Sequence, residues 1–335
     1  MLKLCIAASQ VGAGATTTAV TLAHGIALRH MEVVVVDCDP RGQVASLLGL
    51  PQTSGLFDWL VAQRPLDEVL RPTDTLEYGR PQLSFISSDR KTAGIPYLLH
   101  ADHLRTRLKA ALDQLPADYV IFDTSSAPPA FTEIIMSVAD LLIIPTGLQP
   151  PPFQEVAQIL DSLVAVKSRH GHCQLLGVLP TMSDGSAESA AALGHLGRVC
   201  DGYVLRGIRR SPRLEHCARK GITLWEDDPW SGAADDYTLL VLTVINHVLA
   251  FLPEERVHKE SRRDPRARGK PPIEFPPELI ERLKKAAWQI ALQYPQQEIW
   301  LDEVAYTFLN AGLRHYEDGI LNISFMDQPH APSDE

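Results

Sequence analysis

The chain reads Ser9-Gln10-Val11-Gly12-Ala13-Gly14-Ala15-Thr16-Thr17-Thr18 between its first apolar run and its first helical pattern. Such a loop is typical of phosphate binding, because glycines let backbone N–H groups approach phosphate oxygens and a hydroxyl helps to hold Mg²⁺. Gly12, Gly14 and Thr16 meet these two requirements. A phosphate loop also needs a lysine, and Ala15 stands in that position. An ordinary turn between a strand and a helix is the alternative interpretation.

Aspartates follow two further apolar runs of the chain. Residues 33–36 precede Asp37 and Asp39, and residues 119–122 precede Asp123. Carboxylates at the carboxyl ends of parallel strands lie at the crevice where α/β proteins bind ligands. Each aspartate alone could simply cap the helix that follows it. Together with the loop, the aspartates supply the oxygen ligands that Mg²⁺ and a hydrolytic water require.

Apolar, strand-like runs alternate with helical patterns from the first residue to about residue 250, where residues 237–251 form the last helical pattern. This alternation predicts an α/β fold with a doubly wound, mostly parallel sheet and helices on both of its faces. We expect residues 1–252 to form one domain of this kind.

Three more segments follow in order, at residues 139–145, 176–182 and 208–214. Together with the loop and the two aspartate segments, they resemble the ParA/MinD (Soj-like) family of deviant Walker-type ATPases, which position plasmids, chromosomes and other cargo in bacteria. The loop from Gln10 to Thr17 aligns without a gap with the family pattern Lys-Gly-Gly-Val-Gly-Lys-Thr-Thr. Asp37 to Arg41 is similar to the family's Asp-x-Asp-Pro-Gln segment, and Asp123 to Ser126 resembles its Walker B segment.

The resemblance implies a P-loop NTPase fold of the SIMIBI type and binding of ATP with Mg²⁺. It also implies a homodimer that forms with nucleotide and acts on DNA or cargo, with a ParB-like or cargo-adaptor protein as its partner. In that scheme Asp39 activates water, and Thr16, Asp39 and Asp123 hold the metal. The implied nucleotide-binding residues are Gln10, Val11, Gly12, Ala13, Gly14, Ala15, Thr16 and Thr17 in the loop, and Arg210 and Arg213 beside the base.

Both lysines of the family pattern are absent, because Gln10 and Ala15 stand in their places. Cationic contacts with phosphoryl groups stabilise the transition state by roughly 3 to 7 kcal/mol, so we expect weak or lost hydrolysis. Backbone amides and a helix N-terminus still favour phosphate. Two hypotheses follow: a partition or positioning protein that still binds ATP, or a pseudo-ATPase that keeps the fold as a scaffold or regulator.

Arg41 stands where the family has glutamine. Its guanidinium either compensates for the missing lysines, by reaching the phosphates or crossing a dimer interface, or lies in solvent like an ordinary loop arginine. The first alternative adds Arg41 to the nucleotide-binding residues.

The composition predicts a cytoplasmic protein. Its five cysteines have no disulfide or metal-ligand spacing, and no stretch is long and apolar enough to span a membrane. A net charge of −10 opposes an indiscriminate nucleic-acid coat. Local basic clusters still allow DNA binding through counterion release, which would associate the protein with the nucleoid. The candidate DNA-binding residues are Arg206, Arg209, Arg219, Lys220, Arg262, Arg263, Arg266 and Arg268.

Three further segments follow the large domain. Residues 253–272 are basic without apolar periodicity and predict a flexible linker, which is either merely solvated or a DNA-binding arm. Residues 273–321 predict a short strand and two helices, either a ribbon-helix-helix-like DNA reader or a helical hairpin for self-association or partner docking. Residues 322–335 are expected to form a tail.

Overall fold

The structure is a computed structural model, and it describes residues 1–8, 10–29, 31–73, 83–148, 153–171, 173–200 and 202–251. Two compact units divide the chain, Met1–Val248 and Leu249–Glu335. The fold described below is that of the first unit. The predicted linker, helical segment and tail, with Arg262, Arg263, Arg266 and Arg268, lie outside the described residues.

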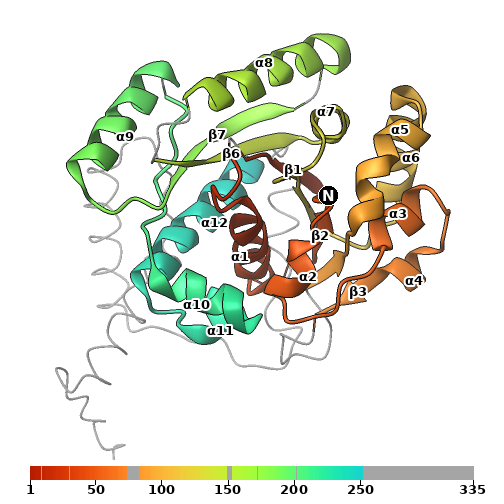
Figure 1. The fold of residues 1–335 in the computed structure, drawn as a ribbon, viewed down its shortest axis with the longest axis horizontal. Coiled ribbons are helices and arrows are strands. Elements are labelled where there is room, and N and C mark those ends of the chain that lie inside the picture. The colour runs from red at the N-terminus through yellow and green to blue at the C-terminus, as the bar shows by residue number, and fades with distance from the viewer. Residues whose placement is uncertain are drawn as a thin grey trace, which may run out of the picture. The chain divides into compact units, whose positions relative to one another are not determined.

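Seven strands form one sheet in the order β3-β4-β2-β5-β1-β6-β7 (Figure 1). They are β1 (Leu2–Ile6), β2 (Val33–Asp37), β3 (Leu70–Pro72), β4 (Leu83–Ile86), β5 (Tyr119–Asp123), β6 (Leu141–Gly147) and β7 (Gln174–Thr181). Every neighbouring pair is parallel except β3 and β4. The mostly parallel sheet is therefore confirmed, and the short antiparallel edge strand β3 is the addition that the sequence patterns did not indicate.

Helices connect the strands. They are α1 (Ala15–Ala27), α2 (Gln43–Leu47), α3 (Gly55–Leu60), α4 (Leu66–Val69), the 3₁₀ helix η1 (Arg90–Gly94), α5 (Ile95–Leu98), α6 (Ala101–Leu112), α7 (Pro129–Met136), α8 (Phe153–His170), α9 (Ala187–Val199), α10 (Pro212–Lys220), α11 (Leu224–Asp227) and α12 (Gly232–Phe251). Helix α12 begins five residues before the predicted helical pattern. Within the described ranges, no helix has the length and apolar character needed to cross a membrane.

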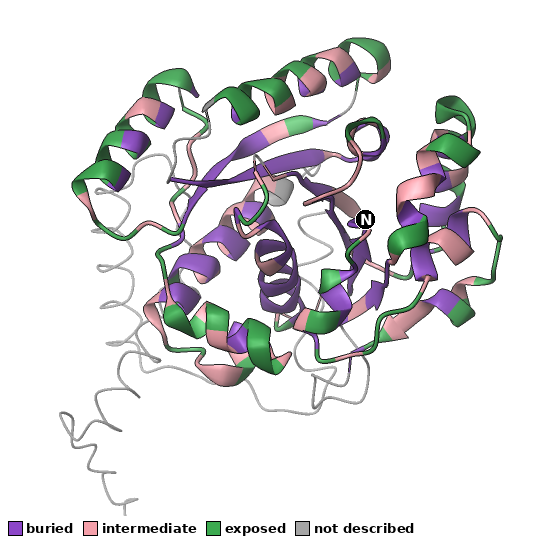
Figure 2. Cartoon of the chain, viewed as in Figure 1, coloured by how far each residue is buried: buried purple, intermediate pink, exposed green. Residues whose placement is uncertain are grey.

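The helices cover both faces of the sheet. Alternate side chains of a strand point to opposite faces, so Val34 and Val36 of β2 join one core cluster and Val33 and Val35 join the other. Residues of α3, α6, α7, α8 and α9 complete the first cluster, and residues of α1, α2, α10, α11 and α12 complete the second. The buried sheet between these two layers is visible in Figure 2. This arrangement confirms the doubly wound fold.

The strand register brings the acidic strand ends level with one another. Ile6 of β1 pairs with Asp123 of β5, and Asp37 of β2 pairs with the same Asp123. Because parallel strands end at one edge of the sheet, the loops after β1, β2 and β5 meet there. Three motifs that lie far apart in the sequence thus become neighbours.

Helix α1 is buried on all sides, with Thr17 as its only residue that is not buried. Its sequence of alanine, threonine and aliphatic residues has no charged face, which is the composition of a helix inside a protein. Gly25 lies where a Cβ atom would be 2.7 Å from the side chain of Val241 in α12 and 2.9 Å from that of Trp225 in α11. Close packing against α11 and α12 therefore fixes the position of the loop that precedes α1.

His24 of α1 gives the fold a dependence on pH. Its Nδ1 atom is 2.7 Å from the Thr223 hydroxyl, and burial lowers its pKa below the ordinary 6.5, with only partial opposition from Glu226. A lowered pKa means that the folded state favours neutral imidazole, so the stability it contributes is present above about pH 6.5 and is lost as pH falls through the folded pKa. We expect the urea midpoint to fall between pH 7 and pH 5, and to fall less in His24→Gln. Substituting the exposed His103 of α6 by Gln is the control, and equal pH profiles for both variants would contradict this role.

Candidate functional site

The glycine-rich loop joins β1 to α1 and has two left-handed glycines. Gly12 has φ +85° and Gly14, the N-cap of α1, has φ +79°. A Cβ at Gly12 would meet nothing within 4 Å, and one at Gly14 would meet only the Met182 side chain at 4.0 Å. Glycine is therefore required at both positions for backbone conformation rather than for space. Val11, which precedes Gly12, is 73% exposed, whereas Ala13 and Ala15 are buried.

Neighbouring elements hold this loop in place. The Thr181 hydroxyl at the end of β7 donates to the Ala13 carbonyl oxygen at 2.9 Å. The Gln10 side chain lies against β6, because a Cβ on Gly147 would be 2.8 Å from Gln10 Nε2. The loop is thus fixed before any ligand arrives, which lowers the entropic cost of binding one.

A pocket of about 540 Å³ opens beside the loop. Gln10, Gly12, Gly14 and Thr17 form its loop side. Its other lining residues are Val11, Gly147, Leu148, Thr181, Met182, Asp184, Ile208, Arg209, Arg210, Ser211, Leu214, Glu215, Ala218 and Tyr237. A mostly apolar wall with a few polar groups next to a phosphate-type loop suits a planar base attached to phosphates.

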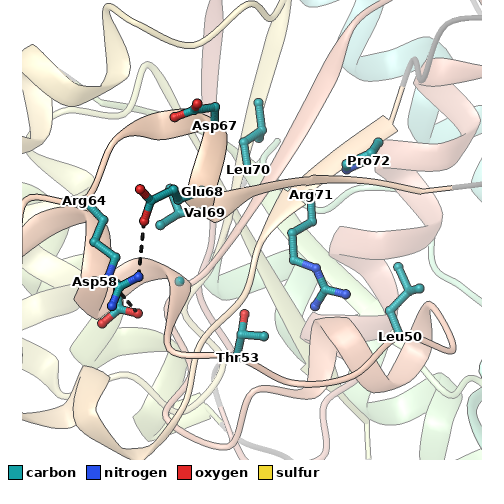
Figure 3. A pocket seen from close by; sticks show the side chains of 11 residues that line it. Leu50, Thr53, Asp58, Arg64, Asp67, Glu68, Val69, Leu70, Arg71 and Pro72 are labelled. Carbon is teal, nitrogen blue, oxygen red and sulfur yellow. Dashed lines mark hydrogen bonds and ion pairs between the residues drawn. The ribbon is translucent and has the colours of Figure 1, made fainter.

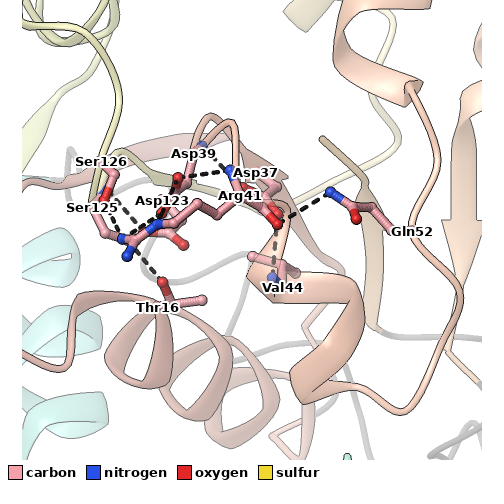
Figure 4. A network of polar contacts seen from close by, with 9 residues as sticks. All are labelled: Thr16, Asp37, Asp39, Arg41, Val44, Gln52, Asp123, Ser125 and Ser126. Carbon is pink, nitrogen blue, oxygen red and sulfur yellow. Dashed lines mark hydrogen bonds and ion pairs between the residues drawn. The ribbon is translucent and has the colours of Figure 1, made fainter. Parts of the chain in front are cut away.

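Three aspartates at the strand ends form a buried cluster next to the loop (Figure 4). Asp37, Asp39 and Asp123 are each fully buried. The Asp37 carboxylate accepts the backbone N–H groups of Asp39 at 3.0 Å and Val44 at 3.2 Å, so it fixes the loop after β2. Oδ1 of Asp123 accepts the backbone N–H of Ser125 at 3.1 Å and also its hydroxyl.

The aspartate cluster has less positive charge than its three carboxyl groups would need. Burial raises the pKa of Asp123 to about 6, although hydrogen bonds from Ser125 and Thr16 oppose this shift. Burial and the neighbouring Asp123 raise the pKa of Asp37 well above its ordinary value. Among the ion pairs of the described residues, the cluster has one cation, Arg41, which binds Asp39. The carboxyl groups of Asp37 and Asp123 therefore have no paired cation. A cation bound beside these two groups would be stabilising.

One oxygen of the cluster is suited to such a cation. Oδ2 of Asp123 is buried and has no hydrogen-bond partner. The Thr16 hydroxyl belongs to the same hydrogen-bond network, because Thr16 Oγ1 is 2.7 Å from the Ser125 hydroxyl that bonds Oδ1 of Asp123. Within the described ranges no group of three His, Cys, Asp or Glu side chains could hold a metal alone. These oxygens therefore fit Mg²⁺, which takes few protein ligands and completes its octahedron with water and phosphate oxygens.

Arg41 pairs with one of the three aspartates. Its Nε atom is 3.2 Å and its Nη2 atom 3.0 Å from Oδ2 of Asp39, and Nη2 also donates to the Ser126 hydroxyl. The guanidinium is therefore bound to the aspartate that the family resemblance assigns to water activation.

Acidic residues neutralise part of the predicted basic cluster. Arg209 binds both oxygens of Asp236, at 2.7 and 2.8 Å, and Arg213 pairs with Asp227 at 3.2 Å and Asp228 at 3.7 Å. For Arg206, Arg210, Arg219 and Lys220, the described part of the chain provides no ion pair within 4.0 Å. No sequence pattern indicated these pairings, because Asp227, Asp228 and Asp236 lie in α11, directly after it and in α12, beyond the arginine-rich stretch.

A second cavity, of about 660 Å³, lies at the β3 edge of the sheet (Figure 3). Its charged side chains are partly paired with each other, since Arg64 is 3.1 Å from Glu68 and 3.9 Å from Asp58. No residue of the glycine-rich loop or the aspartate cluster lines this cavity. We therefore assign the functional site to the loop and not to the larger cavity.

A parallel doubly wound sheet with this loop between β1 and α1, and with buried aspartates at the neighbouring strand ends, defines a P-loop protein. A family model described as an AAA domain, AAA_31, matches residues 1–174. The chain belongs to the ParA/MinD family.

Curated relatives share this assignment. The chromosome partitioning protein ParA of Myxococcus xanthus is 28% identical over 266 residues, which are 76% of this chain and 91% of the relative. The chromosome-partitioning ATPase Soj of Thermus thermophilus is 28% identical over 255 residues, which are 73% of this chain and 96% of the relative.

Solved structures show the same fold. Apo McdA of Cyanothece superposes with a TM-score of 0.64 at 21% identity, covering 73% of this chain and 99% of that one. The septum site-determining protein MinD of Pyrococcus horikoshii, complexed with Mg-ADP, superposes with a TM-score of 0.58 at 18% identity, covering 73% of this chain and 96% of that one.

Proposed function

We propose that this protein binds ATP with Mg²⁺ and forms a nucleotide-dependent dimer that positions DNA or another cargo, with weak or lost hydrolysis. The observation that carries the proposal is the unpartnered buried Oδ2 of Asp123, whose other carboxylate oxygen is linked through Ser125 to the Thr16 hydroxyl of the phosphate loop. A buried, unpaired carboxylate oxygen costs free energy, and a bound cation would remove that cost.

The names of the relatives support the cellular role. The chain spans nearly the whole length of ParA and Soj proteins that are named for chromosome partitioning. A ParB-like or cargo-adaptor protein is accordingly the partner that we propose, and the proposed location is the cytoplasm or the nucleoid surface.

Weak hydrolysis follows from the loop. Ala15 and Gln10 provide no positive charge where the phosphates would lie. Thr16, Thr17 and the first amides of α1 remain, and they favour phosphate binding in the ground state. Binding without rapid turnover is therefore the expected behaviour.

A glycine substitution tests nucleotide binding. Gly12 and Gly171 both have positive φ and open space around them, but only Gly12 belongs to the loop. An alanine strains either backbone by a similar amount. Calorimetry with ATP and Mg²⁺ should show an affinity about tenfold or more lower in Gly12→Ala than in the unchanged protein, and unchanged affinity in Gly171→Ala. No heat of binding at millimolar ATP in the unchanged protein would remove the proposal, and sedimentation with and without ATP tests the dimer.

DNA binding is tested at the end of α10. Arg219 and Lys220 are exposed, and no ion pair within the described residues neutralises them. If they contact phosphates, replacing both by alanine should reduce the slope of log affinity against log salt by about 2. The control is the double variant of Arg107 and Lys109 on α6, which removes the same charge elsewhere. Equal salt slopes in all three proteins would rule out this surface.

The second candidate function is a pseudo-ATPase scaffold. The contact of Arg41 with Asp39 favours it, because that contact occupies the aspartate that hydrolysis would use. In this case nucleotide would bind without turnover, and assembly with a partner protein would not depend on ATP hydrolysis.

A further inference from the structure

Arg41 surrounds the carboxylate of Asp39 with N–H donors. Its Nε atom lies 3.3 Å from Oδ1 and 3.2 Å from Oδ2, its Nη2 atom lies 3.0 Å from Oδ2, and its backbone N lies 2.9 Å from Oδ1. The Asp39 side chain has 0% exposure, so solvent does not reach its carboxylate. Bidentate pairs of this kind are among the stronger contacts in proteins.

The other side of the guanidinium is also bound. Nη2 donates to the Ser126 hydroxyl in the loop after β5, and Ser125 in the same loop bonds the Thr16 hydroxyl. Gln52 donates to the Arg41 carbonyl oxygen at 3.1 Å and to that of Ser88 at 2.9 Å, which fixes the Arg41 backbone. Figure 4 shows the Arg41 side chain extending over Thr16 towards the two serines.

These contacts matter for hydrolysis. When ATP is hydrolysed, a water oxygen bonds to the terminal phosphorus, the bond from that phosphorus to its bridging oxygen breaks, and ADP leaves with that oxygen. The water proton must pass to an acceptor within hydrogen-bond reach. A carboxylate whose oxygens both accept guanidinium N–H groups, and which solvent does not reach, is not available as that acceptor.

We propose that Arg41 is a positioning residue that holds Asp39 in an ion pair and thereby blocks hydrolysis, independently of the missing lysines. This inference rests on the proposed nucleotide site. It deepens that proposal, because the chain then has two separate blocks: a phosphate loop without a lysine, and an aspartate occupied by its own arginine. Restoring the lysine alone does not restore turnover.

The test combines two substitutions, Ala15→Lys and Arg41→Gln. We expect Ala15→Lys to bind ATP more tightly while its turnover stays within about threefold of the unchanged protein, because proton transfer remains blocked. The double variant should turn over ATP at least about 100-fold faster than Ala15→Lys, which is the usual contribution of a positioned base. Arg64→Gln, which removes an arginine from a surface ion pair, is the matched control and should change nothing when added to Ala15→Lys.

Two results would overturn the inference. One is turnover in Ala15→Lys that already rises far above that of the unchanged protein. The other is a double variant that binds ATP but is no faster than Ala15→Lys. Failure of every variant to bind ATP would instead refute the proposed nucleotide site, so the two failures are distinguishable by calorimetry.

A second measurement needs no nucleotide. If Arg41 is the cation for Asp39, its removal leaves a buried carboxylate that Mg²⁺ can neutralise. Arg41→Gln should therefore gain several degrees of melting temperature from Mg²⁺, whereas the unchanged protein and Arg41→Lys should gain less. An equal Mg²⁺ response in all three proteins would contradict the role of Arg41, whatever the calorimetry shows.

Discussion

Ala15→Lys is expected to raise the affinity for ATP by about 10- to 100-fold. Ala15 is the first residue of α1, directly after the left-handed Gly14 that begins the helix. A lysine there would add a positive charge to the helix end that already favours phosphate. A hydrogen bond to a charged group contributes about 1.5 to 3 kcal/mol, which corresponds to this range.

Calorimetry with ATP and Mg²⁺ measures the effect, and Gln43→Lys is the matched control. Gln43 is also the first residue of a helix that follows a left-handed glycine, Gly42, but it belongs to α2. Gln43→Lys tests whether a positive charge at any such helix start is enough to raise the affinity for ATP. If both variants gain the same affinity, or if neither does, the absent lysine at Ala15 is not what limits ATP binding.

Gly221→Ala is expected to destabilise the protein by about 2 to 4 kcal/mol. Gly221 ends α10 with φ +67°, and a Cβ there would lie 2.6 Å from the Cα and 2.9 Å from the N of Gly49. These are backbone atoms of the segment that follows α2, so they cannot move aside as a side chain can. The added methyl group must separate α10 from α2, and α10 carries Leu214 and Ala218 of the pocket wall.

Urea unfolding of Gly221→Ala and Gly185→Ala separates two causes of lost stability, the steric contact with Gly49 and the backbone strain of a positive φ. Gly185 has φ +75° and nothing within 4 Å of an added Cβ, so its substitution introduces backbone strain alone. We expect Gly221→Ala to lose clearly more stability than Gly185→Ala, and to bind ATP less tightly. Equal losses would mean that the approach of Gly221 to Gly49 has little energetic weight.

The sheet and its loop could be predicted because their signals are local. Apolar runs bounded by glycine or aspartate mark β1, β2 and β5, and the structure places them within a residue or two of the expected positions. Strand β3 was not predicted, because three residues on an edge give too short a pattern to recognise.

The candidate site was predicted only as a set of residues. The sequence indicated the loop, Asp39 and Asp123 as neighbours, but no pattern in it indicated that Arg41 pairs with Asp39. It also presented Arg209 as a DNA-binding candidate and Arg213 as a residue beside the base, and these side chains are bound to Asp236, Asp227 and Asp228. A run of arginines in the sequence shows how many positive charges are present. The number available to bind a ligand depends on which acidic side chains form ion pairs with those arginines in the folded chain.

The sequence by itself determined the family, the order of the elements and the absence of both lysines, because each depends on residue types at fixed spacing. Only the tertiary structure decided that Asp39 is occupied by Arg41 while Oδ2 of Asp123 is without a partner. The physical reason is that a side chain's partner depends on distances across the sheet. The loops after β2 and β5 meet at the edge of the sheet because their strands are paired in register, and that register is a property of the folded chain.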